Sequence, residues 1–102
     1  MTTFELQNLL KHSVDLTILD VREPFELDIY SFEHALHIPM MQVPMALQKI
    51  PKDKPVIVAC HLGIRSQMTV NFLKERGFEN IHDLVGGIDH WAKNCDPLMQ
   101  QY

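Results

Sequence analysis

The sequence predicts an α/β domain built on a parallel β-sheet with helices on both faces. Two short apolar runs, residues 16–21 and 55–60, lack the polar alternation of a half-exposed strand, which is typical of strands covered on both sides. Apolar strand patterns also alternate with helical patterns about ten residues long, and this alternation is characteristic of parallel sheets.

The first elements follow from local signals. Thr2 and Glu5 match a capping box, which predicts a helix from there to about Lys11. Residues 16–21 form a strand rich in apolar and β-branched side chains. Pro24, a favourable first helical residue, begins a helical turn through Leu27.

The middle of the chain predicts two more strands and a helix. Residues 36–38 form a short strand that Pro39 ends. Pro44 begins a helix that ends before Pro51. Residues 55–60 have apolar side chains at odd and even positions alike, which indicates a central strand of a parallel sheet.

The last third predicts a helix, a strand and a final helix. Ser66 begins a helix that Gly77 closes, with Met68, Phe72 and Leu73 facing inward. A strand over 80–84 then leads through Gly86 and Gly87 into a helix that Trp91 anchors to the core.

Composition indicates one globular domain over residues 1–102, because 46% of the 102 residues are hydrophobic and 22% are charged. Thirteen acidic against nine basic residues give a net charge of −4 without a basic patch, which argues against nucleic-acid and membrane partners. The longest apolar run, residues 56–60, is too short for a membrane helix or a signal peptide. We therefore expect a cytoplasmic protein.

Cys60 is the residue most suited to chemistry. It ends a buried strand and precedes a tight loop and a helix N-terminus, where backbone N–H groups and the helix dipole favour a thiolate. Arg65 adds a positive charge, and Gly63 permits a positive φ in the loop. A small buried cysteine without reactivity is the alternative that these residues alone leave open.

Three segments together resemble one family. Residues 60–66, CHLGIRS, are similar to the C-x-x-G-x-R-S active-site loop of rhodanese-type sulfurtransferases. Residues 20–26, DVREPFE, resemble the D-V-R-E-P-x-E segment of that family, and residues 86–91, GGIDHW, resemble its G-G-x-x-x-W. The departures lie in residues 29–36, where Tyr30-Ser31 replaces Gly-His and His34 stands in place of a glycine before Ala35.

The resemblance implies a rhodanese-like fold and a cysteine that carries sulfane sulfur as a persulfide, with no cofactor and no metal. It implies a small sulfur donor, a thiol or cyanide acceptor, and as further candidates a protein persulfide or a thiol protein. Cys60 is then the sulfur acceptor, and the loop that surrounds the sulfur consists of His61, Leu62, Gly63, Ile64 and Arg65. The residues that support the sheet and the loop are Asp20, Arg22 and Ser66.

Two alternative functions stay open. A phosphatase or arsenate reductase of the same fold would use an equivalent cysteine, but that class separates cysteine and arginine by five residues, whereas four separate Cys60 from Arg65. A module that binds partners or carries a persulfide in a sulfur relay is the other alternative. The single loop cation, Arg65, suggests that thiosulfate is a poor natural donor.

Several side chains have a functional and a structural interpretation. Ordinary surface or half-buried positions account for His34, His37 and His61 better than a metal site does, because no matched second cysteine accompanies them. Packing accounts for Met40, Met41 and Met45 better than a hydrophobic mouth for substrate does. Cys95 is a weak candidate for a resolving thiol.

Overall fold

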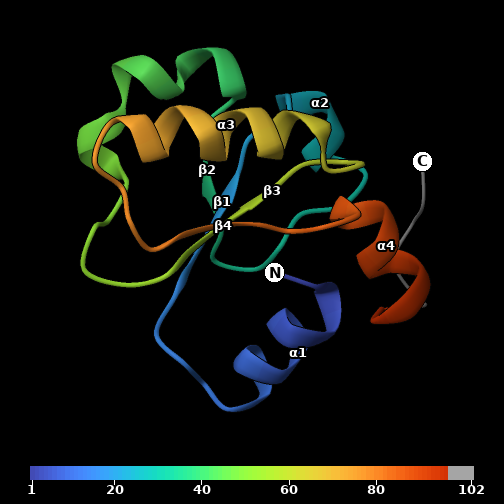
Figure 1. Cartoon of the computed structure of the whole chain (residues 1–102). Helices are drawn as coiled ribbons and strands as arrows, with labels where there is room; N and C mark the ends of the chain where they lie inside the picture. The colour runs from blue at the N-terminus through green and yellow to red at the C-terminus, as the bar shows by residue number, and fades with distance from the viewer. Residues whose placement is uncertain (97–102) are drawn as a thin grey trace.

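A computed structural model describes residues 1–96 of the chain and places four parallel strands in one sheet of order β2-β1-β3-β4 (Figure 1). The predicted domain therefore extends six residues, 97–102, beyond the described part. The strands are β1 (Thr17–Asp20), β2 (Leu36–His37), β3 (Val56–Ala59) and β4 (Ile81–Asp83). The helices are α1 (Thr3–Lys11), α2 (Pro24–Leu27), α3 (Ile64–Glu75) and α4 (Gly87–Asn94), with 3₁₀ segments η1 (Met40–Met45) and η2 (Leu47–Lys49).

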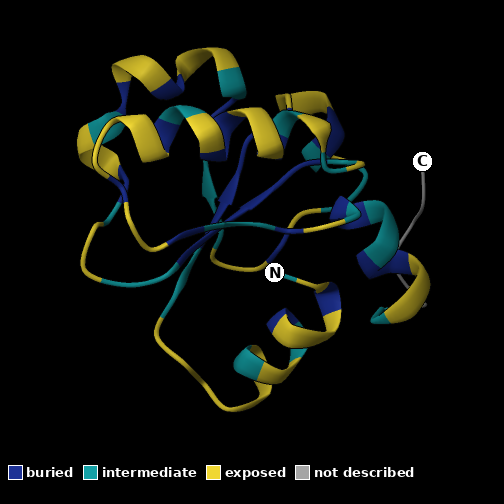
Figure 2. Cartoon of the chain, in the orientation of Figure 1, coloured by how far each residue is buried: buried dark blue, intermediate teal, exposed yellow. Residues whose placement is uncertain are grey.

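Helices cover both faces of the sheet, as the sequence predicts. Figure 1 shows α2, α3 and the 3₁₀ segments on one side and α1 and α4 on the other. Each face has its own hydrophobic core, one around Leu19, Val58 and Leu73 and the other around Ile57 and Trp91. The central strands β1 and β3 are buried almost throughout (Figure 2), which explains their apolar composition.

The signals at the helix ends are confirmed. Thr2 caps α1 with its side chain while Glu5 completes the capping box. Pro24 begins α2. Gly77, just past α3, has φ +89, a left-handed conformation that glycine adopts without steric cost.

Three details differ from the sequence prediction. No helix begins at Pro44; instead, Pro44 lies inside a 3₁₀ segment that begins at Met40. Helix α3 begins at Ile64, two residues before Ser66, because Gly63 turns the chain with φ +103. Met68 is 57% exposed rather than directed inward, so the inner face of α3 is formed by its smaller residues and Leu73.

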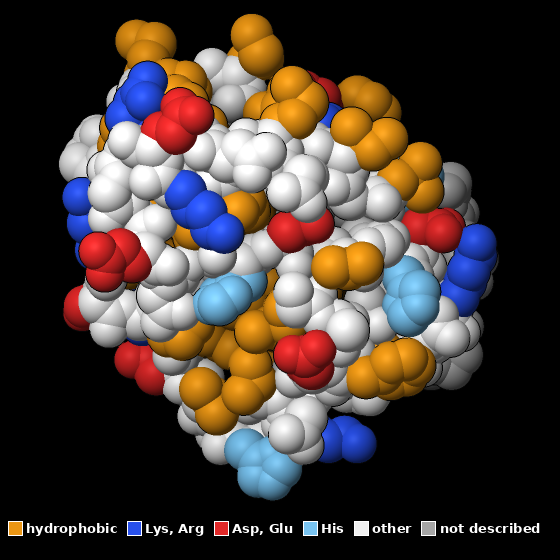
Figure 3. Space-filling model, in the orientation of Figure 1, with side chains coloured by type: hydrophobic (Ala, Val, Ile, Leu, Met, Phe, Trp, Pro, Cys, Tyr) orange, Lys and Arg blue, Asp and Glu red, His pale blue; other side chains and the backbone are white. Residues whose placement is uncertain are grey.

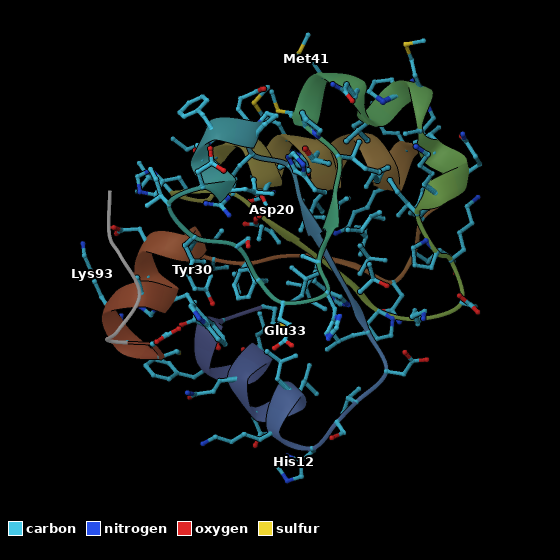
Figure 4. The ribbon with its side chains drawn as sticks, turned by 180° about the vertical axis from the view of Figure 1, so that it is seen from behind. His12, Asp20, Tyr30, Glu33, Met41 and Lys93 are labelled. Atoms are coloured by element: carbon cyan, nitrogen blue, oxygen red, sulfur yellow. The ribbon has the colours of Figure 1, made fainter. Side chains whose placement is uncertain are left out.

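The segment over 29–36 keeps a turn that needs a positive φ. His34 has φ +62, so the residue that replaces a glycine adopts the left-handed conformation directly. Figure 4 shows neighbouring Glu33 in the connection that leads from α2 toward β2. No helix within residues 1–96 is long and apolar enough to cross a membrane.

Candidate active site

The carboxyl ends of the strands bring the candidate residues together. Cys60 directly follows β3, Asp20 ends β1 and Asp83 ends β4. Because all four strands are parallel, these ends lie along one edge of the sheet, where α/β proteins commonly bind ligands. The site therefore lies where β3, the loop after it and α3 meet.

Backbone N–H groups surround the Cys60 sulfur. The N–H of Gly63 donates to Sγ at 3.1 Å and the N–H of Ser66 donates at 3.3 Å. Both donors belong to the loop and to the first turn of α3, whose leading N–H groups have no acceptor within the helix. The sulfur is thus held by the electropositive end of α3.

A second helix fixes the loop from the other side. The N–H of Ile88 donates to the carbonyl of Cys60, and the N–H of Asp89 donates to that of His61, both at 2.9 Å. In a planar trans peptide the N–H points opposite to the C=O, so the N–H groups of His61 and Leu62 face away from α4. Helix α4 therefore orients the loop amides.

Gly87 permits this close approach. A Cβ on Gly87 would lie 2.5 Å from the carbonyl oxygen of His61 and 2.6 Å from that of Cys60. Its φ of +64 is likewise suited to glycine.

A cavity of about 250 Å³ opens over the sulfur. Cys60 itself is only 1% exposed, so reactants reach Sγ through this cavity. Two exposed apolar side chains, Leu62 and Ile64, line the cavity, and Figure 3 shows hydrophobic side chains on the surface above α3 and beside α2. The residues that line the cavity are Cys60, His61, Leu62, Ile64 and Arg65, all of them predicted.

Arg65 is paired rather than solitary. Its guanidinium donates to both carboxylate oxygens of Glu26, at 2.7 and 2.8 Å, and the Glu26 side chain is only 5% exposed. The sequence interpretation of Arg65 as a positive charge for the thiolate therefore needs correction, because a buried carboxylate compensates that charge. The pair instead ties the loop to α2.

Asp20 and Arg22 form a buried pair beneath the site. Arg22 Nη2 lies 2.8 Å from Asp20 Oδ2, and both side chains are fully buried. The guanidinium also donates to the carbonyls of Glu26 and Tyr30, at 3.4 and 2.6 Å. Asp20 lies in the interior of the molecule at the end of β1 (Figure 4). From there the pair holds the segment that follows β1.

Ser66 connects the sulfur to Asp83, a residue that the sequence motifs do not indicate. The Cys60 thiol donates to Ser66 Oγ at 3.4 Å, and Ser66 Oγ lies within hydrogen-bond distance of Asp83 Oδ1. A signal for Asp83 was present, since a carboxylate ends the strand beside that of Cys60.

Other candidates lie apart from the cavity. Cys95 follows the last turn of α4, eight residues beyond Gly87, which is about 12 Å along the helix axis from the end of α4 that contacts the loop. His37 contacts the carbonyl of Arg22 at 2.7 Å, and His34 is exposed. Within residues 1–96 no three His, Cys, Asp or Glu side chains are grouped to hold a metal. Met41 is 79% exposed and projects outward in Figure 4, and Met45 is 87% exposed, so packing explains neither.

A family model supplies the decisive comparison. The model described as Rhodanese-like domain matches residues 2–94. The chain belongs to the rhodanese-like family. A protein named Sulfurtransferase from Allochromatium vinosum is 32% identical to this rhodanese-like domain over 94 residues, covering 92% of this chain and 88% of that protein. Thiosulfate sulfurtransferase GlpE from Coxiella burnetii is 40% identical over 80 residues, 76% of this chain and 72% of GlpE.

Solved structures agree with the family. The crystal structure of a rhodanese-related protein from Thermoplasma volcanium superimposes with a TM-score of 0.85 at 35% identity, covering 93% of this chain and 91% of that one. A longer relative also contains such a domain: this chain spans 26% of the probable adenylyltransferase/sulfurtransferase MoeZ of Mycobacterium tuberculosis, at 35% identity.

Proposed function

We propose that this rhodanese-like domain is a sulfurtransferase that moves sulfane sulfur from a donor to cyanide or a thiol through a persulfide on Cys60. The observation that supports the proposal most is the pair of N–H groups, from Gly63 and Ser66, directed at the sulfur of a cysteine that lines an open cavity. Relatives named sulfurtransferases support the same reaction class.

The reaction consists of two successive nucleophilic displacements at sulfur. With thiosulfate, the Cys60 thiolate attacks the outer sulfur, the S–S bond of the donor breaks, and sulfite leaves with the electron pair. With a donor persulfide the leaving group is a thiolate. The acceptor, cyanide or a thiolate, then attacks the outer sulfur of the Cys60 persulfide, and the S–S bond breaks. Cys60 is regenerated as a thiolate, and the product is thiocyanate or a new persulfide.

The loop geometry suits a persulfide. An S–S bond of about 2.05 Å carries the outer sulfur from Sγ toward the cavity. The amides of His61 and Leu62 are turned away from α4, and we expect them to meet the incoming negative charge there. Preorganised N–H donors stabilise charge at fixed positions without reorganisation, so no partner base is required.

The charges at the site favour an uncharged or protein-borne donor over thiosulfate. Glu26 neutralises Arg65, and Leu62 and Ile64, which line the cavity, are 56% and 70% exposed. A dianion therefore meets no uncompensated guanidinium at the mouth, whereas an apolar segment that presents a persulfide meets complementary side chains. We expect a persulfide donor to charge Cys60 faster than thiosulfate does.

The test is mass spectrometry of the unreduced protein, together with a cyanide assay of sulfur transfer. Cys60→Ser is expected to lose transfer and the additional sulfur mass while circular dichroism stays unchanged, because an oxygen at this position cannot form a persulfide. Cys95→Ser is the matched control and is expected to keep both. Transfer near the level of the unaltered protein in Cys60→Ser would overturn the proposal.

The same preparation separates the alternatives. Hydrolysis of an aryl phosphate by the unaltered protein would favour the phosphatase, although the four-residue ring between Cys60 and Arg65 is narrow for a tetrahedral oxyanion. A protein that accepts no sulfur from any donor would favour a binding module.

A further inference from the structure

Ser66 lies between two groups that compete for its single proton. A hydroxyl carries one donor hydrogen and two acceptor lone pairs. Around Ser66 Oγ lie Asp83 Oδ1, the carbonyl oxygen of Gly63 at 3.1 Å and Cys60 Sγ at 3.4 Å. Three acceptors are thus available to one proton whenever Cys60 is a thiolate.

An ionised Asp83 is the strongest of these acceptors. Hydrogen bonds to a carboxylate are roughly twice as strong as those to neutral groups, so the Ser66 proton points at Asp83. The lone pair of Oγ then faces Cys60, where it accepts the S–H hydrogen. This arrangement satisfies the thiol and leaves the thiolate without the Ser66 hydroxyl as a donor.

We propose that Asp83, acting through Ser66, is a positioning residue that restrains thiolate formation at Cys60 and so limits the reactivity of the uncharged site. The inference rests on the proposed function, since it concerns the same nucleophile. This effect of Asp83 opposes that of the Gly63 and Ser66 amides, which favour the thiolate. In the persulfide form Sγ has no hydrogen, so the restraint applies only to the resting enzyme.

Other charges around the three residues stay the same when Asp83 changes. The Met1 ammonium donates to the main-chain carbonyl of Asp83 at 2.8 Å, and Arg65 is bound to Glu26. Strand β3 carries apolar residues only. The remaining titratable groups on the loop, β4 and the start of α4 are His61, His82, Asp89 and His90, and His90 Nδ1 lies 2.7 Å from Thr3 Oγ1.

The test measures the alkylation rate of Cys60 against pH by iodoacetamide, in a Cys95→Ser background that leaves one thiol. Asp83→Asn is expected to move the profile to lower pH by about one unit, so that alkylation below the midpoint is about tenfold faster. The amide oxygen of asparagine accepts a weaker hydrogen bond than a carboxylate oxygen does, so the Ser66 hydroxyl donates more readily to the thiolate.

Two further variants identify the path. Ser66→Ala is expected to move the profile in the same direction by less, and Asp83→Asn is expected to shift the profile less in the Ser66→Ala background than alone, because only the direct effect of its charge then remains. Asp89→Asn is the matched control: Asp89 lies in the first turn of α4 against the loop but pairs with Lys93, so its loss removes one negative charge without affecting Ser66. Its profile is expected to match the background.

An unchanged profile in Asp83→Asn, a move to higher pH, or equal shifts in Asp89→Asn would overturn the inference. Because alkylation needs no sulfur donor, its outcome is separate from that of the cyanide assay. A shifted alkylation profile in a protein that transfers no sulfur would overturn the proposed function and leave the role of Asp83 standing.

Discussion

Among the four glycines of the chain, Gly87 has the least room for a side chain. Its left-handed φ and the carbonyls of Cys60 and His61 leave no space for a Cβ. Gly87→Ala is expected to lower the free energy of unfolding by about 2–4 kcal/mol, since backbone strain and a backbone clash act together. Urea unfolding measures the loss, and the cyanide assay is expected to fall with it because α4 no longer orients the loop amides.

Gly77→Ala is the matched comparison for Gly87→Ala. Gly77 also has a positive φ, but the nearest atom to its Cβ is Lys52 Nζ at 3.7 Å, the end of a flexible side chain. The expected loss is about 1 kcal/mol with sulfur transfer retained. Equal losses in the two variants would mean that φ alone, rather than contact with the loop, explains the requirement for Gly87.

Between elements, the Arg65–Glu26 pair joins the active-site loop to α2. Arg65→Ala leaves a carboxylate that is 5% exposed without its bidentate partner, so unfolding is expected to require about 1–3 kcal/mol less. Adding Glu26→Gln to Arg65→Ala is expected to recover part of that loss, because a neutral amide then replaces the buried carboxylate that lost its bidentate partner. Chemical denaturation of both variants provides the measurement.

A surface pair serves as the control for that experiment. Lys93, labelled in Figure 4, pairs with Asp89 one turn earlier and is 57% exposed. Lys93→Ala is expected to cost less than 1 kcal/mol, as exposed pairs do. A loss as large as that of Arg65→Ala would contradict the special role of the loop pair.

The sequence predicts elements better than the pairings between them. Local signals located the strands around Ile18 and Val58 because burial on both faces leaves a continuous apolar run. Pro44 misled the prediction, since proline fits a tight 3₁₀ turn as well as a helix start. Arg65 and Glu26 are 39 residues apart, so no local pattern announces their pairing. Ser66 and Asp83 meet only because β3 and β4 are neighbours.

For the molecule as a whole, ionisation of Tyr30 lowers the stability of the fold at alkaline pH. Burial, and then the negative charge of Asp96, raise the pKa of the Tyr30 phenol above its usual 10.0. The folded protein therefore holds this proton more tightly than the unfolded chain does. The resulting stabilisation is complete below pH 10 and is lost as pH rises through the raised pKa.

Tyr30→Phe tests this prediction because phenylalanine cannot ionise. It retains a ring beside Phe32, which Tyr30 contacts edge-on with 5.6 Å between the ring centroids. The difference in urea midpoint between variant and unaltered protein is expected to be constant from about pH 7 to 9 and to move in favour of the variant above about pH 10. A difference that does not change with pH would show that Tyr30 ionises equally in the folded and unfolded states.

The strand order has a consequence for association between copies of the chain. The two outer strands, β2 and β4, contain two and three residues, whereas the long central pair is enclosed. Open strand edges are templates on which further chains assemble, and very short edges offer few free hydrogen-bonding groups. On the β4 side, Met1 already occupies part of the edge by bonding to Asp83 and Val85. The sheet is therefore protected against edge-to-edge aggregation by its own dimensions.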